Sequence, residues 1–501
     1  MDRLFIESLG QITEVETGDR WDSNKLKDEI CRRTNYYSQK GIGENDIVII
    51  LHNNNNRFFA DLFSLWMIGA CVACLDKVIG KNEFDNITKE LEVNYVITDN
   101  GLPVQLKSSV KRITTLDTNE ANSYDIKLIS KKKNLDSPAL ILFTSGSTGL
   151  PKGVIHSLRT LQTKWFTLQH YVPLDRCNTT LCLLPTHFGH GLICNALYPL
   201  VHGKHVVMLP KSDIKNLTNL SKIIDQYQIT FMSSVASIWR IVLRLCPPPE
   251  KKTLQQVNIG SAPLGSKLWK AVQKWSGTTQ VWNTYGITET GSWLAGPKIG
   301  EEFEPEDGLI GYGWGTEIMI TNVTDISALS DANKISLPQG EKGYVWLRTP
   351  CLMHGYWNQE KDTQEVMQGS WFYTGDVGMI DERGRLILTG RERNEINKGG
   401  MKISPEELDI IFEKHPAILE ACAFAIDDNI FGQNIGICLV FERERDKPSL
   451  SNLKKWSIKN VSDYKIPIIW YDVKTIPKTS RGKIKRDEVA DYCKSLKSIQ
   501  D

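Results

Sequence analysis

The chain has 501 residues, which at roughly 150 residues per domain predicts more than one domain. Lys and Arg number 60 and Asp and Glu 59, and a net charge of +1 argues against bulk electrostatic attraction to nucleic acid or to an anionic membrane. The 11 cysteines show no CxxC pair and no repeated spacing, so buried thiols in a reducing compartment are expected.

No targeting or membrane-spanning segment is expected. Residues 1–25 contain acidic side chains and lack the apolar core of a secretory signal. The longest apolar run, Leu62–Leu75, includes Ser64 and Gly69 and is shorter than the ~20 residues that a transmembrane helix needs. We therefore expect a cytoplasmic enzyme, with neither nucleic acid nor a membrane as its partner.

The first hundred or so residues alternate between predicted helices and strands. A helix is expected over Ser23–Gln39, followed by a strand at Asp46–Leu51 (DIVIIL) and a helix that begins at Arg57. Two further buried strands are expected at Gly69–Val72 and Tyr95–Thr98. This alternation predicts parallel sheets covered by helices on both faces, an α/β fold.

An apolar run at Ala139–Phe143 predicts a buried strand that leads into a loop of small residues. The loop consists of Thr144, Ser145, Gly146, Ser147, Thr148 and Gly149. Glycines let backbone N–H groups approach an anion, and the hydroxyls and the Lys152 ammonium add donors, so the loop is predicted to bind phosphate. It is not a Walker A loop, because no Gly-Lys-Ser/Thr closes it, and the alternative is a surface turn. A helix predicted over Val154–His170 would add its N-terminal N–H groups.

The whole stretch Leu140–Gly153 (LILFTSGSTGLPKG) resembles the signature of the adenylate-forming enzymes, the superfamily of acyl-CoA synthetases, adenylation domains and luciferases. The resemblance extends from about residue 30 to about residue 490. It implies a large N-terminal domain over residues 1–392, with parallel α/β sheets and a β-rich subdomain, and a small mobile α+β lid over residues 393–501. It also implies that ATP and Mg²⁺ activate a carboxylic acid as an acyl-adenylate, which a thiol converts into a thioester.

A second segment, Leu183–Leu192 (LLPTHFGHGL), is similar to the family's fourth motif, which borders the acid pocket. In the family's register His187 takes an aromatic position and Phe188 the gate. Gly189 stands where amino-acid-activating members have an aspartate for the substrate's α-ammonium. Leaving that ammonium buried and unpaired would cost on the order of several kcal/mol, so α-amino acids are disfavoured. His187 and His190 lack a third ligand with metal-site spacing, so no metal site is expected here.

Further residues fall near the family's pocket segments and favour an aromatic or medium-length apolar acid, although aromatic residues in such segments are more often core. They are Met232, Ser233, Ser234, Trp239 and Trp293. The resemblance also assigns Gly260, Gly286 and Gly291 to the pocket.

Two elements resemble nucleotide-binding segments of the family. The first is the turn of Gly260, Ser261, Ala262 and Pro263, which can lie flat against a purine. The second is Asn283–Thr290 (NTYGITET), which includes Gly286 and matches the fifth motif. In it the Tyr285 ring can stack on adenine, and the Asn283 amide can read the 6-amino group. The Thr288 hydroxyl can meet the α-phosphate, and Glu289 offers Mg²⁺ the hard oxygen ligand that it prefers.

The segment Ile310–Trp357 changes to short strands and glycine turns, which predicts the β-rich subdomain. In the family pattern Asp376 accepts hydrogen bonds from both ribose hydroxyls, and Arg391 can reach ribose or phosphate as a fixed cation. Arg393 occupies the position of the hinge between the two domains. Members of the family commonly have Asp or Lys there, so this chain departs from the pattern at its hinge.

The C-terminal segment carries two further matches. Gly399 and Gly400 resemble the hairpin that swings to line the pantetheine tunnel. Pro477–Arg486 (PKTSRGKIKR) matches the last motif, in which the lysine after glycine, here Lys483, is catalytic. A basic tail for nucleic acid is the alternative, which the chain's balanced charge disfavours. A cation between an approaching carboxylate and a polyanion lowers their repulsion, about 4 kcal/mol for two unit charges ~4 Å apart at a dielectric of 20.

The sequence therefore predicts an acyl-CoA synthetase with ATP, Mg²⁺ and coenzyme A as cofactors and a small carboxylic acid as substrate. The alternative acceptor is the phosphopantetheine arm of an acyl carrier protein acting in trans. A non-catalytic adenylate binder would be expected to lack Lys483 or Glu289, and both are present. Light-emitting oxidation shares every motif but needs a special substrate.

Overall fold

The structure is a computed structural model of the chain. It describes residues 8–52, 54–77, 79, 81–99, 110–115, 134–144, 152–301, 303–325, 335–398, 401–428, 431–442, 447–461, 465–479 and 482–499. Ser145–Gly149 of the predicted phosphate loop and Gly399 and Gly400 of the predicted tunnel lie outside these residues.

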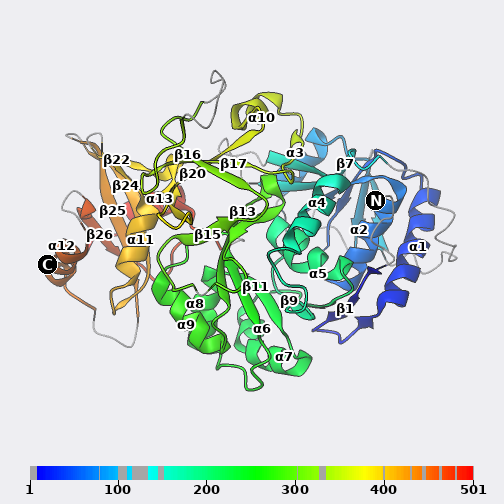
Figure 1. Cartoon of the computed structure of the whole chain (residues 1–501), viewed down its shortest axis with the longest axis horizontal. Helices are drawn as coiled ribbons and strands as arrows, with labels where there is room; N and C mark the ends of the chain where they lie inside the picture. The colour runs from blue at the N-terminus through cyan, green and yellow to red at the C-terminus, as the bar shows by residue number, and fades with distance from the viewer. Residues whose placement is uncertain are drawn as a thin grey trace.

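The described residues form three sheets. Figure 1 places the first sheet near one end of the molecule, the C-terminal sheet at the other end, and the strands of the second sheet between them. The predicted α/β class is confirmed, with parallel strands β3 to β7 in the first sheet and β9 to β13 in the second. No helix among the described residues is long and apolar enough to cross a bilayer.

The first sheet is built from strands that alternate with helices along the chain. In spatial order its strands are β18 (Gly355–Tyr356), β8 (Lys152–Ser157), β7 (Pro138–Thr144), β4 (Cys71–Cys74), β3 (Ile47–Ile50), β5 (Tyr95–Thr98) and β6 (Lys111–Thr114). The helices of this region are α1 (Ser23–Gln39), α2 (Asn56–Ile68), α3 (Lys81–Glu90) and α4 (Leu158–Leu168).

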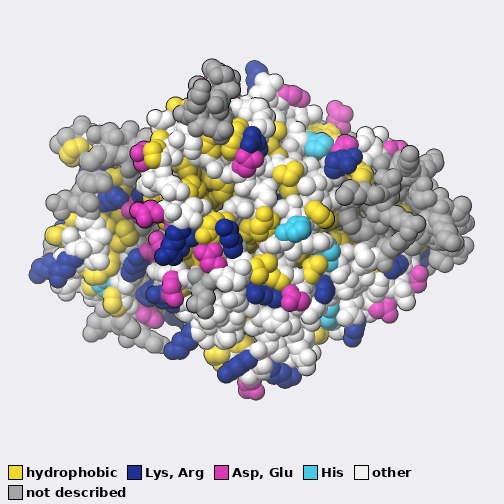
Figure 2. Space-filling model, in the orientation of Figure 1, with side chains coloured by type: hydrophobic (Ala, Val, Ile, Leu, Met, Phe, Trp, Pro, Cys, Tyr) yellow, Lys and Arg dark blue, Asp and Glu magenta, His cyan; other side chains and the backbone are white. Residues whose placement is uncertain are grey.

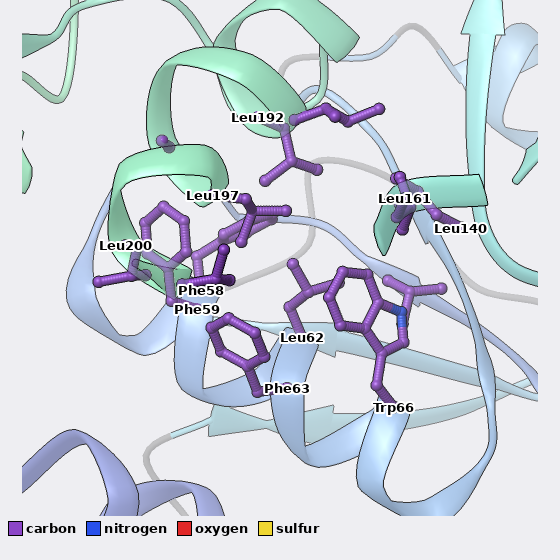
Figure 3. Packing of buried hydrophobic residues seen from close by; sticks show 14 of the residues in the cluster. Phe58, Phe59, Leu62, Phe63, Trp66, Leu140, Leu161, Leu192, Leu197 and Leu200 are labelled. Atoms are coloured by element: carbon purple, nitrogen blue, oxygen red, sulfur yellow. The ribbon is translucent and has the colours of Figure 1, made fainter. Parts of the chain in front are cut away.

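Helix α2 organises the largest core. Asn55 caps its N-terminus by accepting from the Phe58 N–H, and Gly69 ends it with a φ of 97°. Nearly every side chain of α2 is buried, which fits a helix that is apolar on all sides. Figure 3 shows its side chains packed against neighbouring elements: Phe58, Phe59, Leu62, Phe63 and Trp66 face Leu140 of β7, Leu161 of α4, and Leu192, Leu197 and Leu200. This core joins the phosphate-loop strand to the segment that follows the predicted gate.

The second sheet has the most strands of the three. It combines the parallel strands β9 to β13 with antiparallel strands from residues 292–391. Its order is β16 (Glu317–Thr321), β17 (Gly343–Arg348), β20 (Trp371–Ile380), β21 (Leu386–Arg391), β15 (Leu309–Gly313), β14 (Ser292–Gly296), β13 (Val281–Ile287), β12 (Gln256–Gly260), β11 (Phe231–Val235), β9 (Thr179–Cys182), β10 (His205–Met208), β1 (Gln11–Glu14) and β2 (Arg20–Trp21), with β19 (Met367–Gln368) beside β20. The predicted β-rich strands thus extend the parallel sheet, because β14 pairs antiparallel with β13. The helical segments here are η4 (a π-helix, His190–Leu197), α5 (Tyr198–Val201), α6 (Ile214–Thr218), α7 (Leu220–Tyr227), α8 (Ala236–Leu245), α9 (Ser266–Ser276), η5 (Thr288–Thr290) and α10 (Glu360–Val366).

The C-terminal segment has a sheet and cores of its own. The sheet order is β23 (Met401–Ile403), β22 (Ile396–Lys398), β25 (Gly432–Phe441) and β24 (Ile418–Asp428), with β26 (Ile469–Asp472) beside β25. The accompanying segments are η7 (Glu392–Asn394), α11 (Pro405–Glu413), α12 (Leu450–Asn460) and α13 (Arg486–Lys494). Two buried clusters draw their members only from residues 396–493. The boundary at residues 392 and 393 stays a prediction.

The predicted helix over Val154–His170 is wrong in its first part. Residues up to Ser157 form strand β8, which pairs antiparallel with β7, and α4 begins only at Leu158. The β-branched Val154 and Ile155 fit a strand, and Ser157 caps α4 in a capping box with Thr160. The predicted phosphate loop therefore connects two antiparallel strands, and a strand rather than a helix N-terminus directly follows Gly153.

The prediction of buried thiols is confirmed, because all 11 cysteines are buried and free, while the reducing compartment stays a prediction.

Candidate functional site

Asp376 lies at the centre of the predicted ribose site. Its strand β20 pairs with β21 so that Asp376 and Arg391 are direct neighbours. Arg391 Nε donates to Asp376 Oδ1 at 2.7 Å, and the Tyr285 hydroxyl donates to Oδ2. Burial and the adjacent Asp376 carboxylate raise the pKa of Tyr285, so the phenol stays a donor. Two residues that are far apart in the sequence, Tyr285 and Arg391, thus orient the Asp376 carboxylate, an acceptor suited to a diol.

Asn283 and the neighbouring glycines shape the predicted adenine site. Asn283 Nδ2 donates to the Leu309 carbonyl at 2.8 Å, an orientation that leaves Oδ1 as an acceptor for an amino group. A Cβ on Gly260 would lie 2.7 Å from the Thr284 carbonyl oxygen, and one on Gly286 would lie 2.4 Å from the Ser292 carbonyl. Only glycine fits at these two positions. Ser261 follows with a φ of 64°, and Ala262 and Pro263 complete that turn.

Glu289 faces a tyrosine that sequence reasoning missed. The Tyr356 hydroxyl donates to Glu289 Oε1 at 2.8 Å, and burial raises the pKa of Tyr356. Lys152 Nζ lies 5.0 Å from the centre of the Tyr356 ring and 3.0 Å from Asp362 Oδ2. The carboxylate of Glu289 suits Mg²⁺, which prefers oxygen ligands and keeps several waters. Thr144, paired with Lys152 across β7 and β8, brings the ends of the predicted phosphate loop to this place.

The predicted gate residues lie in contact. The ring centres of His187 and Phe188 are 4.1 Å apart, and His187 Nε2 lies 3.7 Å from Asp76 Oδ2. A Cβ on Gly189 would meet Leu142 at 3.4 Å, so this position faces an apolar side chain. The expectation that Gly189 excludes an α-ammonium stays a prediction, and the Asp76 carboxylate lies beside His187.

His190 is buried between two serines. Its Nδ1 lies 2.9 Å from Ser261 Oγ and its Nε2 2.6 Å from Ser233 Oγ. Burial lowers the pKa of His190 to about 3, so the ring is neutral at physiological pH. Sequence reasoning weighed His190 only as a metal ligand. Its two serine contacts come from strand β11 and from the turn after β12, both far away in the sequence.

Some predicted pocket residues point elsewhere. Ser234 Oγ accepts from Trp239 Nε1 at 2.6 Å, while Ser233 bonds His190, because successive residues of a strand face opposite sides of the sheet. The Ser234 side chain therefore lies on the face of the sheet opposite to His190. Trp239 and Trp293 are at most 1% exposed and belong to buried clusters, and the Trp293 ring packs edge-on against His190 with 5.6 Å between ring centres. The assignment of Trp293 to the pocket stays a prediction. A Cβ on Gly291 would meet Lys164 at 3.5 Å.

The Lys483 loop lies against the large domain. A Cβ on Gly482 would lie 2.3 Å from Ser237 Oγ in the first turn of α8, and the Lys483 side chain is exposed. Arg240 of α8 donates to both Glu413 oxygens at 2.7 Å, which ties α8 to α11. Arg393 lies in η7, between β21 and β22, and its side chain is outside the described structure.

Charged side chains of both signs lie on the face of the molecule that Figure 2 shows. Figure 2 shows basic and acidic side chains intermingled on the viewed face, in agreement with the balanced charge of the chain. This charge distribution therefore fits a protein that binds a nucleotide and a small acid better than one that binds nucleic acid.

Comparison with known proteins gives a consistent result. The family model described as AMP-binding enzyme matches residues 9–357. Oxalate–CoA ligase of Arabidopsis thaliana is 28% identical over 91% of this chain and 90% of its own length. A 2-succinylbenzoate–CoA ligase of Geobacillus is 26% identical over 93% and 91%. The crystal structure of ATP-bound MatB from Rhodopseudomonas palustris superposes with a TM-score of 0.85, at 20% identity over 97% of this chain and 96% of that one.

Proposed function

Because this chain belongs to the AMP-binding enzyme family, we propose that it joins a carboxylic acid without an α-amino group, aryl or medium-length and apolar, to coenzyme A. It is an acid–thiol ligase of the AMP-forming type, with ATP, Mg²⁺ and coenzyme A as cofactors. We propose the identity of the acid and the roles of the residues that act on it.

The observation that best supports the site is the carboxylate of Asp376, held by Tyr285 and Arg391. A ribose diol needs an oriented acceptor there, and the Asn283 Oδ1 acceptor and the Gly260 turn lie on the neighbouring strands β13 and β12. The β13 segment then continues into Thr288 and Glu289. One nucleotide can thus be bound from adenine to phosphate along a continuous stretch of chain.

In the first half-reaction a carboxylate oxygen attacks the α-phosphorus of ATP, and pyrophosphate leaves. Lys483 stabilises the charge that develops between the two anions, while the Thr288 hydroxyl donates to the α-phosphate. Mg²⁺, held by Glu289, would neutralise phosphate charge. The enzyme contributes mainly position and electrostatic stabilisation, as in other phosphoryl-transfer reactions.

In the second half-reaction the thiol sulfur attacks the acyl carbon, and AMP leaves. We propose that the lid turns about Arg393, removes Lys483 and brings Gly399 and Gly400 to the thiol path. A free coenzyme A thiol is the proposed acceptor, and a carrier-protein phosphopantetheine arm is the alternative.

A second candidate for the acid follows from the buried Ser261–His190–Ser233 group. Neutral imidazole and two hydroxyls can serve a second polar or anionic group on the acid better than an apolar chain. Oxalate and 2-succinylbenzoate, named for two relatives, are acids of this kind.

Acid-dependent exchange of labelled pyrophosphate into ATP tests these proposals. The panel contains benzoates, medium-chain fatty acids, dicarboxylic acids and the proteinogenic amino acids, and thioester formation is then measured with coenzyme A or with a pantetheinylated carrier protein. Exchange that is best with aryl or apolar acids supports the first proposal, and exchange best with dicarboxylic acids replaces it by the second. Robust exchange with an amino acid overturns both proposals for the acid. Thioester formation on the carrier protein but not on coenzyme A overturns the proposed acceptor.

A further inference from the structure

The turn that presents Thr288 and Glu289 has an unusual backbone. After the 3₁₀ segment η5, Gly291 has a φ of 66° and Ser292 a φ of 75°, so two successive residues lie in the left-handed region. A non-glycine residue adopts this conformation only where its surroundings impose it. The side chains that surround this turn therefore decide where Glu289 points.

Two buried side chains hold the turn from behind. His156 Nε2 donates to the Thr288 carbonyl at 2.8 Å, and Lys164 Nζ donates to the Trp293 carbonyl at 2.7 Å. His156 is fully buried, and Lys164 is 1% exposed. The first hydrogen bond reaches Thr288, one residue before Glu289, and the second reaches Trp293, four residues after it. Gly291 lies between them, since its Cβ would be 3.5 Å from Lys164 and 3.9 Å from His156.

The chemistry of the two residues differs. A carbonyl only accepts, so His156 Nε2 carries the proton, and burial lowers the pKa of His156 to about 4, which keeps the ring neutral. Lys164 forms no ion pair with a carboxylate within the parts of the chain that the structure describes. A buried ammonium group needs hydrogen-bond partners, and the Trp293 carbonyl is a partner that the structure gives Lys164.

Both residues come from the elements that follow the predicted phosphate loop. His156 lies on β8, four residues after Lys152, and Lys164 lies on α4. Glu289 lies within the turn that His156 and Lys164 support, and its side chain accepts a hydrogen bond from the Tyr356 hydroxyl. One hydrogen bond thus connects β8 with the Thr288 end of this turn, and a second connects α4 with its Trp293 end.

We propose that His156 and Lys164 are positioning residues for adenylation: they fix the Thr288–Trp293 turn so that Glu289 and Thr288 meet the metal and the α-phosphate. This inference rests on the proposed function of the site. Both residues act through the backbone carbonyls of the turn. The Lys164 charge adds an attraction for the phosphate chain from behind the turn.

The test uses Lys164→Met, His156→Leu and His156→Gln in the full chain. Binding of MgATP is measured by calorimetry without acid, and pyrophosphate exchange is measured over a range of Mg²⁺ concentrations. Loss of residues that orient a metal ligand commonly costs ~10 to 100-fold in metal affinity or activity. We expect Lys164→Met and His156→Leu to raise the Mg²⁺ concentration for half-maximal exchange about tenfold or more and to weaken MgATP binding.

His156→Gln supplies a donor in place of Nε2 and is expected to retain most of the activity of the parent. Thioester formation from preformed acyl-adenylate should change little in all three variants, because it does not use Glu289 in this way. Matched controls are Arg159→Met, an exposed cation on the same helix, and His205→Gln, a histidine outside the site. Neither control should shift the Mg²⁺ dependence.

Three results would overturn the inference. One is an unchanged Mg²⁺ dependence in folded Lys164→Met and His156→Leu. Another is an equal loss of both half-reactions that follows the loss of thermal stability, which is the signature of a purely structural role. The third is a defect in His156→Gln equal to that in His156→Leu. If the parent binds MgATP yet exchanges with no acid, the proposed function fails, while the calorimetric comparison still tests the positioning role.

Discussion

Breaking the contact between Arg240 and Glu413 should change the balance between the two half-reactions. Arg240 Nη2 lies 2.7 Å from both carboxylate oxygens, and each side chain is only 17% exposed. A second contact, Lys267 Nζ to the Glu413 carbonyl at 3.0 Å, would remain in Arg240→Met. A hydrogen bond to a charged group contributes about 1.5–3 kcal/mol, and we count the Arg240–Glu413 contact as one such interaction because a single nitrogen, Nη2, reaches both oxygens.

That range corresponds to a shift of about 10 to 150-fold in the equilibrium between the lid position in this structure and any other position. The structure places the Lys483 loop against α8, so we assign its lid position to adenylation. Arg240→Met should therefore reduce pyrophosphate exchange by up to that factor, and thioester formation from preformed adenylate should be unaffected or faster.

The assay compares Arg240→Met, Glu413→Gln and the double variant in the two half-reactions separately. If the pair acts as a unit, the double variant should be little worse than either single variant. Arg348→Met, which breaks an exposed pair within the large domain, is the control and should change neither activity. Equal loss of both half-reactions in Arg240→Met, or no change in either, would refute the assignment of this contact to the lid.

Three further predictions follow from the structure. Lys483→Ala should reduce adenylation by ~10² to 10³-fold, the effect of losing one preorganised charge-stabilising group, and should spare thioester formation from preformed adenylate; equal losses, measured separately, would contradict a mobile lid. Arg393→Pro, which fixes φ near about −65°, should preserve exchange and abolish transfer to the thiol, and retention of both activities would move the hinge elsewhere. Burial raises the pKa of Asp61, but Arg33 and hydrogen bonds from His52 and Tyr37 outweigh it and lower this pKa to about 2. The ionised carboxylate therefore contributes about 2 kcal/mol to the free energy of unfolding at neutral pH, which is lost as pH falls from about 4 to about 2. Acid titration of unfolding should show a weaker pH dependence in Asp61→Asn, and an equal dependence would contradict it.

The sequence was most informative where the chemistry is local. The apolar run before Thr144 could be assigned from its own residues, because a strand followed by small residues has few other uses. The glycines of the nucleotide motifs were assigned from the resemblance to the adenylate-forming enzymes. Gly260 and Gly286 show the reason directly: a side chain there would collide with the neighbouring strand. The strand β8 was mistaken for a helix, because its pairing with β7 outweighs local preference.

The contacts that complete the site could not be predicted, since each joins distant segments. Tyr356 reaches Glu289 across 67 positions, and Lys164 reaches the Trp293 carbonyl across 129. No periodicity or motif encodes such a pair, because it depends on how sheets and helices pack. The opposite directions of Ser233 and Ser234 could have been predicted, as adjacent residues of a strand alternate.

The fate of the acid's oxygen tests the central claim most directly. When a substrate acid labelled with a heavy oxygen isotope in its carboxylate is incubated with the enzyme, ATP, Mg²⁺ and coenzyme A, the acyl-adenylate route predicts one labelled oxygen in the phosphate of AMP and none in pyrophosphate. Pyrophosphate exchange should also occur without coenzyme A. Release of ADP and labelled inorganic phosphate, or unlabelled AMP alongside the thioester, would contradict an acyl-adenylate intermediate and with it the roles assigned to Glu289 and Lys483.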